Sequence, residues 1–105
     1  MGRKWKIWVF GKPVQVEEVD MNYFNDESAS KYGAVDCREG KIWIANNQLA
    51  ENKLETLIHE VIHIFCDEMK IELEEQQIQQ LALGFFLLCK ENDINIKKLM
   101  RGKDG

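Results

Sequence analysis

The sequence contains little of what cross-links small secreted domains or anchors proteins in membranes. It has three cysteines among 105 residues, Cys37, Cys66 and Cys89, and their odd number and irregular spacing make a poor disulfide framework. Its apolar runs are too short to span a bilayer. Residues 11–13 (Gly-Lys-Pro) interrupt the N-terminal region before the apolar core of a signal peptide can form. We therefore expect a reducing compartment, with the cytosol as the default location.

Clustered positive charge is also lacking. The formal net charge is −4 and the pI is about 5.2, and the basic residues near both ends of the chain are few and dispersed. Nucleic acids and anionic membranes both attract clustered lysine and arginine, so neither is expected as a partner. The chain does carry a hydrophobic fraction of 45%, which suffices for the core of a single domain spanning residues 1–105.

The first part of the chain, residues 1–46, reads mainly as strands. β-Formers and apolar–polar alternation mark four segments, and a short turn with Gly40 makes a hairpin of the last two. The polar stretch at residues 20–31 reads as a loop or a short irregular helix. The candidate strands are Trp5–Phe10, Val14–Glu17, Gly33–Cys37 and Lys41–Ala45.

Residues 47–90 read as two helices. The first, at about residues 51–68, has apolar positions on more than one face, so we expect it to lie between the sheet and the second helix. The second, at about residues 74–90, has an apolar stripe of Ile78, Leu81, Ala82, Phe85, Leu88 and Cys89. The tail, residues 91–105, holds at most one more helical turn near residues 94–99. The predicted class is α+β, with a small antiparallel sheet of about four strands packed on two helices.

Residues 59–63 read His-Glu-Val-Ile-His, and His59 and His63 are the only histidines in the chain. Positions i and i+4 of a helix lie one above the other, about 6 Å apart along the axis, so two imidazoles there can bind one zinc ion. Glu60 is rotated by about 100° from His59, which suits it to act as general base on a zinc-bound water. The alternative is a hydrogen-bonded histidine pair with a surface glutamate, but an unused polar triplet among apolar residues is costly to bury.

A catalytic zinc site needs a third protein ligand, and no third histidine exists. Glu75 is the first candidate, because it lies 12 positions after His63 and shares the inward side of the second helix. Gln79, one turn later, could hold it by a hydrogen bond. Glu74 and Glu72 remain alternatives, since acidic residues are also common at helix N-termini without any ligand role.

The cysteines are weaker candidates for the third ligand. Cys66 lies seven residues after His59 on the same helix face, and three ligands on one straight helix surround an ion poorly. Cys37, in the hairpin, could approach the site as the thiolate ligand does in peptide deformylases, whose glycine-rich and glutamine-containing motifs are missing here. We expect all three cysteines to be small buried thiols.

At these residues the chain resembles the HExxH zinc metallopeptidases of the ImmA/IrrE-like and minigluzincin type, including the short versions found in phages. The segments that carry the resemblance are Tyr32–Asp36, Gly40–Ile44, Glu55–His63 and Glu75–Ala82. The resemblance implies a zincin-like fold, a Zn²⁺ cofactor and hydrolysis of a peptide or protein substrate with Glu60 as general base. It also implies Glu75 as the third ligand beside His59 and His63.

Two alternative functions remain at this point. One is a non-catalytic zinc-binding module for structure or interaction. The other is a latent enzyme, because the C-terminal segment can occupy the cleft in minigluzincins and residues 91–105 could do likewise.

Zincins usually bind an extended peptide along the strand before the active-site helix. Here that strand is Lys41–Ala45, although Trp43 and Ile44 could equally just cover the core. Tyr32, Tyr23 and Arg101 are open candidates for stabilising an oxyanion.

Overall fold

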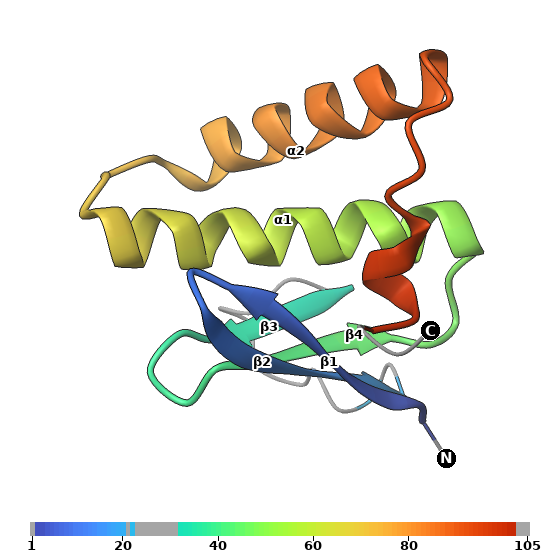
Figure 1. Ribbon diagram of the computed structural model, residues 1–105, viewed down its shortest axis with the longest axis horizontal. Helices are drawn as coiled ribbons and strands as arrows, with labels where there is room; N and C mark the ends of the chain where they lie inside the picture. Colours follow the sequence, from blue (N-terminus) through green and yellow to red (C-terminus); the bar gives the residue numbers. More distant parts are fainter. Residues whose placement is uncertain (1, 21, 23–31, 103–105) are drawn as a thin grey trace.

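The chain folds into three layers, a sheet and two helices. The computed structural model describes residues 2–20, 22 and 32–102. Figure 1 shows the sheet at the bottom, the first helix across it and the second helix outermost. The elements are β1 (Lys4–Val9), β2 (Lys12–Val19), β3 (Gly33–Asp36), β4 (Lys41–Ala45), α1 (Ala50–Met69), α2 (Glu75–Glu91) and the 3₁₀ turn η2 (Lys97–Met100). The predicted α+β class is confirmed.

The sheet is mixed, with strand order β1-β2-β4-β3. β1 and β2 form one antiparallel hairpin, β3 and β4 form another, and β2 pairs with β4 in parallel. The prediction of a purely antiparallel sheet is therefore wrong at that one pair. Apolar–polar alternation fixes which side of a strand is buried, but it does not select the neighbouring strand.

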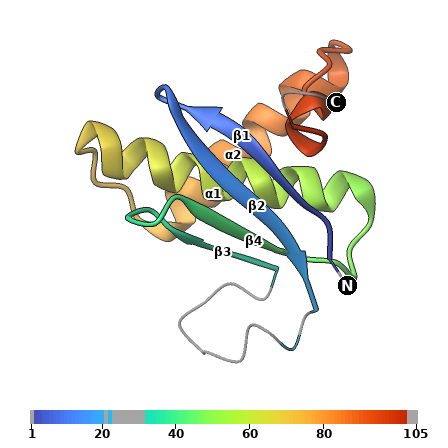
Figure 2. The same cartoon turned by 60° about the horizontal axis from the view of Figure 1, so that its bottom comes forward.

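β4 lies inside the sheet, which decides between the two alternatives for residues 41–45 in favour of core cover. It is hydrogen-bonded to β2 on one side and to β3 on the other, so it cannot accept a peptide by edge pairing. The strands at the edges of the described sheet are β1 and β3, as Figure 2 shows.

The main core fills the space between the sheet and α1. Alternate residues of β1 and β2 point toward the helix, as the strand pattern predicts. Ile42, Ile44 and Leu57 are completely buried. The buried members of this core are Ile7, Val9, Val14, Val16, Ile42, Ile44, Leu57 and Ile64.

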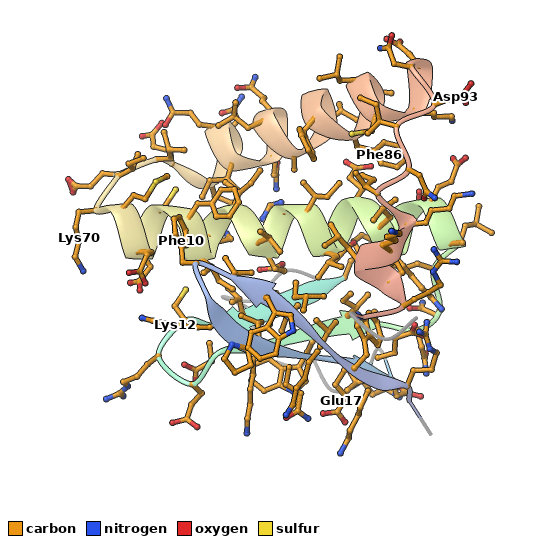
Figure 3. The ribbon with its side chains drawn as sticks, in the orientation of Figure 1. Phe10, Lys12, Glu17, Lys70, Phe86 and Asp93 are labelled. Atoms are coloured by element: carbon orange, nitrogen blue, oxygen red, sulfur yellow. The ribbon has the colours of Figure 1, made fainter. Side chains whose placement is uncertain are left out.

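α1 is also covered on its other side, by α2. A second core cluster joins Leu54 and Ile58 of α1 to Ala82 and Phe86 of α2, and Figure 3 shows Phe86 in the space between the two helices. α1 ends at Lys70, which takes a left-handed conformation (φ 58°) and donates its N–H to the Cys66 carbonyl. The predicted position of the first helix between sheet and second helix is confirmed.

α2 buries three residues of the predicted stripe, while the other three are about half exposed. Ile78, Ala82, Phe86 and Cys89 are buried, whereas Leu81, Phe85 and Leu88 are about half exposed. Residues 81–89 are uncharged on every side of the helix, so their periodicity does not single out one face. No helix among the described residues is long and apolar enough to cross a membrane.

The described part of the tail packs against β1. The Trp5 indole Nε1 donates to the Leu99 carbonyl (2.6 Å) and Arg3 Nη2 donates to the Met100 carbonyl (2.6 Å). Residues 93–97, 100 and 101 line a cavity of about 700 Å³ with the N-terminal end of α1 and the C-terminal end of α2. The helical turn expected near residues 94–99 is present as η2.

Truncation of the central core contact should show how much the fold depends on the sheet–α1 interface. Leu57→Ala removes a fully buried side chain, and we expect a loss of about 2–5 kcal/mol in the free energy of unfolding, measured with urea. Leu49→Ala, at a 76% exposed position, is the control and should change it by less than about 0.5 kcal/mol. Equal effects of the two substitutions would contradict this core.

Candidate metal centre

His59 and His63 lie on one face of α1. One helical turn separates them, so their rings are neighbours, with centroids 5.1 Å apart. Their side chains are 14% and 31% exposed, so the pair is accessible from one side. The two rings are thus carried by a helix that packs on the sheet and on α2.

Glu75, the first residue of α2, joins these two imidazoles. Its Oε2 lies 2.6 Å from His59 Nε2 and its Oε1 lies 2.9 Å from His63 Nε2. The left-handed turn at Lys70 and the link at residues 71–74 reverse the chain, so the first turn of α2 returns over the middle of α1. One carboxylate therefore spans both ring nitrogens.

The other two acidic candidates do not reach the histidines. Glu74 is the N-cap of α2, where its side chain and that of Gln77 form a capping box. Glu72 is exposed, and within the described residues it has no ion pair or hydrogen bond to either histidine. Gln79 makes no hydrogen bond to Glu75 in this part of the chain. The structure thus brings Glu75, and neither Glu74 nor Glu72, to the pair.

Glu60 is buried next to the histidines, on the side of α1 that faces β3. Glu60 as a whole residue is 3% exposed. Across residues 2–20, 22 and 32–102, no ion pair or hydrogen bond to it is present. Burial, with the negative charge of Glu75 adding, raises the pKa of Glu60 from 4.5 to about 8. Glu60 also lines the cleft, and no fully buried polar side-chain atom of the described residues lacks a hydrogen-bond partner, so its carboxyl group keeps access to the cleft.

Gly33 of β3 makes room for this carboxylate. A Cβ atom at residue 33 would lie 3.0 Å from Glu60 Oε2 and 2.5 Å from Thr56 Cγ2. Gln48 links the chain before Gly33 to the end of β4, because its Nε2 donates to the Tyr32 and Ala45 carbonyls (3.2 and 2.9 Å). The Thr56 hydroxyl donates to Gln48 Oε1 (3.1 Å). Sequence reasoning missed these three supporting residues, because no spacing rule connects them to the histidines.

The donor atoms fit a metal ion. One ligand atom each from His59, Glu60 and His63 lie within 4.8 Å of one another. Ligand atoms around tetrahedral zinc lie about 3.3 Å apart, given metal–ligand distances near 2.0–2.1 Å. Glu75 is closer than this to both Nε2 atoms and would have to withdraw by about 0.5 Å, which its 53% exposed side chain permits. This group can therefore hold a metal ion.

The cysteines are not part of the centre. Cys37 Sγ lies 3.8 Å from the backbone oxygen of His63 and not at its ring. Burial raises the pKa of the Cys37 thiol, and the charges of Asp67 and Asp36 raise it further, so the thiolate that binds metals is disfavoured. Cys89 is buried, and Cys37 and Cys66 are half-buried.

A cleft of about 880 Å³ opens beside His59 and Glu60. Tyr32 and Glu55 line it, and so do six amide side chains, while none of the described lysines and arginines does. The amides are Asn47, Gln48, Asn52, Gln76, Gln79 and Gln80. Its walls are thus mostly neutral hydrogen-bonding groups.

The other residues proposed for this site lie in different parts of the molecule. Of the candidates for stabilising an oxyanion, Tyr32 lines the cleft, Arg101 lines the cavity at the far end, and Tyr23 lies outside the described residues. Residues 92–102 line no part of the cleft. As far as Gly102, the tail therefore does not block the cleft.

No protein-family model matches the chain, and no curated protein or solved structure is detectably similar to it. The functional argument therefore rests on the residues and geometry of the site.

Zinc titration of the metal-free protein tests the assignment of Glu75. We expect the wild type to bind one ion per chain. Glu75→Ala should lose at least about 100-fold in zinc affinity, because loss of a residue that only hydrogen-bonds to a metal ligand already costs about 10–100-fold. Glu72→Ala is the matched control and should bind zinc like the wild type. Unchanged affinity in Glu75→Ala would remove Glu75 from the ligand set.

The pKa of Glu60 predicts how the metal-free protein responds to pH. Between pH 4.5 and about 8 the folded state keeps a proton that the unfolded state has released. The contribution of this proton to the free energy of unfolding is therefore fully present below pH 4.5 and is lost as the pH rises through 8. Glu60→Gln mimics the protonated side chain and should be more stable than the wild type by about 3 kcal/mol at pH 7.

Urea unfolding with a chelator from pH 4.5 to pH 8 measures this effect. The two proteins should be alike at the acid end, and Glu39→Gln, at the exposed turn between β3 and β4, should follow the wild type throughout. Parallel profiles for Glu60→Gln and wild type would mean that Glu60 carries no raised pKa.

Proposed function

We propose that this protein is a zinc-dependent peptidase in which His59, His63 and Glu75 hold the metal and Glu60 is the general base. One observation carries the proposal: two imidazoles and a carboxylate from different helices converge, and a second, largely buried carboxyl group lies beside them at the cleft. Two nitrogen ligands and one oxygen ligand suit zinc well.

Each side chain has a distinct role in the reaction. His59, His63 and Glu75 would hold the zinc ion, which would supply Lewis-acid chemistry toward water and a substrate carbonyl. Glu60 takes the proton of the attacking water on a carboxylate oxygen and delivers it to the leaving amine. Burial raises the pKa of Glu60 to about 8 in the metal-free protein, and a bound cation would lower that pKa and so favour the ionised base.

Position on the helix favours Glu60 as base and Glu75 as ligand. Residue 60 is turned by about 100° from residue 59 and packs toward Gly33 of β3. Glu75 approaches from α2 and already contacts both Nε2 atoms. The two carboxylates therefore approach the centre from different sides, which leaves each free for a different task.

The edge of the sheet supports a peptide as the substrate. β3 lacks a second partner in the described sheet, and its first residue, Gly33, touches the Glu60 carboxylate region. An extended peptide added to that edge would run directly past the proposed base. The amides of the cleft can donate to and accept from its main chain.

A non-catalytic zinc module is the second candidate, and one observation favours it. Glu60 offers a donor atom within 4.8 Å of both histidines, so all four side chains together could close a four-ligand structural site. In that case Glu60 is a ligand, and the centre has no open position for a substrate.

Glu60→Gln separates the two functions. A general base predicts that the variant retains zinc while its cleavage of a peptide library, followed by mass spectrometry, falls by at least about 100-fold. Glu39→Gln is the control for the same chemical change and should cleave like the wild type. Loss of zinc together with activity would instead favour the structural site, and full activity in Glu60→Gln would exclude its role as base.

A further inference from the structure

The outer surface of α2 is apolar where a surface helix normally carries charge. From Gln76 to Cys89 the helix has no charged residue, in a chain that is 30% charged. Within the described part of the chain, α2 is covered on the side that packs on α1. A helix segment that is apolar all round is normally buried all round.

The exposed apolar residues lie together in the middle of this helix. Leu81 and Leu88 are both 52% exposed and Phe85 is 47% exposed, on one flank. Leu83 (45%) and Leu87 (39%) continue the surface onto the other flank. We call these five residues the α2 outer surface. Figure 1 shows that no described element covers α2 on its outer side.

Gly84 lies within the α2 outer surface. A Cβ atom at this position would meet nothing within 4 Å, so packing inside the chain does not require a glycine. Glycine inside a helix is unfavourable relative to alanine, and an approaching backbone from outside is the usual reason to keep one.

The apolar area is large enough for a dimer. With roughly 200 Å² for a large side chain, the five residues expose on the order of 400 Å² per copy, and two copies would bury about 800 Å². Homodimer interfaces are about 65% apolar, so the total would be about 1,200 Å², the lower limit of specific interfaces.

A second copy fits this surface better than a membrane does. Helices that lie on membranes carry lysine and arginine along their polar face, whereas α2 has Lys90 alone, paired with Glu51. Two copies of a chain with net charge −4 repel each other, but the stretch 76–89 brings no charge into the contact. We propose that α2 packs antiparallel against α2 of a second copy, centred near Gly84.

The proposed interface borders the candidate metal centre. Leu83 belongs to the α2 outer surface and also lines the cleft beside His59. The second copy would therefore form part of the cleft wall. This proposal does not depend on the proposed peptidase activity, because it concerns the packing of α2 alone.

Sedimentation equilibrium over micromolar to millimolar concentrations tests the dimer. We expect the wild type to reach twice the mass of the 12.3 kDa chain, and the double variant Leu81→Glu/Leu88→Glu to remain a monomer. Ile71→Glu, at a similarly exposed position (44%) outside α2, should dimerise like the wild type. Far-ultraviolet circular dichroism and thermal unfolding show whether each variant is folded.

Gly84→Ala separates folding from association. Alanine fits the open space in the single chain and favours the helix, so the melting temperature extrapolated to low concentration should not fall. Dimer affinity should nevertheless drop by 10-fold or more, because the added methyl group keeps the helices apart.

A wild type that remains a monomer at millimolar concentration would overturn the proposal, including one that instead binds lipid vesicles. A dimer that survives the double variant and Gly84→Ala would also overturn it, since another surface would then carry the contact.

Discussion

The burial of α1 on two opposite sides is the constraint on which the rest of the structure depends. The sheet covers it through Leu57, and α2 covers it through Ile58. His59 and His63 lie on a face of α1 that reaches solvent. Glu60 falls on the sheet side of these histidines, so the same packing that orders the helix also largely buries a group that is negatively charged when ionised. A bound cation would compensate for that charge.

The metal centre is assembled from contacts distant in the chain. α1 supplies the imidazoles and Glu60, the start of α2 supplies Glu75, and β3 leaves space through Gly33. Glu75 reaches the histidines because Lys70 turns the chain back sharply. Glu75 lies at the two imidazoles, and among the described residues no lysine or arginine lines the cleft to oppose a divalent cation.

Sequence reasoning succeeded where the residue types and their helical spacing indicate the same structure. The helix pattern predicted α1, the histidine spacing predicted that both imidazoles share one face, and the inward side of the second helix pointed to Glu75, which lies at both rings. It failed where partners are chosen in space: the parallel pairing of β2 with β4 leaves no local signal, and the uncharged run in α2 made Leu81 and Phe86 equivalent candidates for the core. Gly33 escaped notice because its importance lies in what a side chain would displace.

The central claim is that Glu75, and not Glu60 or a cysteine, completes the metal site. A crystal structure of the zinc-loaded protein, with anomalous scattering recorded at the zinc absorption edge, tests it most directly. The account predicts one anomalous peak, about 2.0–2.1 Å from the Nε2 atoms of His59 and His63 and from a Glu75 oxygen, with Glu60 beyond ligand distance. A peak ligated by Glu60 in place of Glu75, a peak at Cys37, or no peak between the histidines would contradict it.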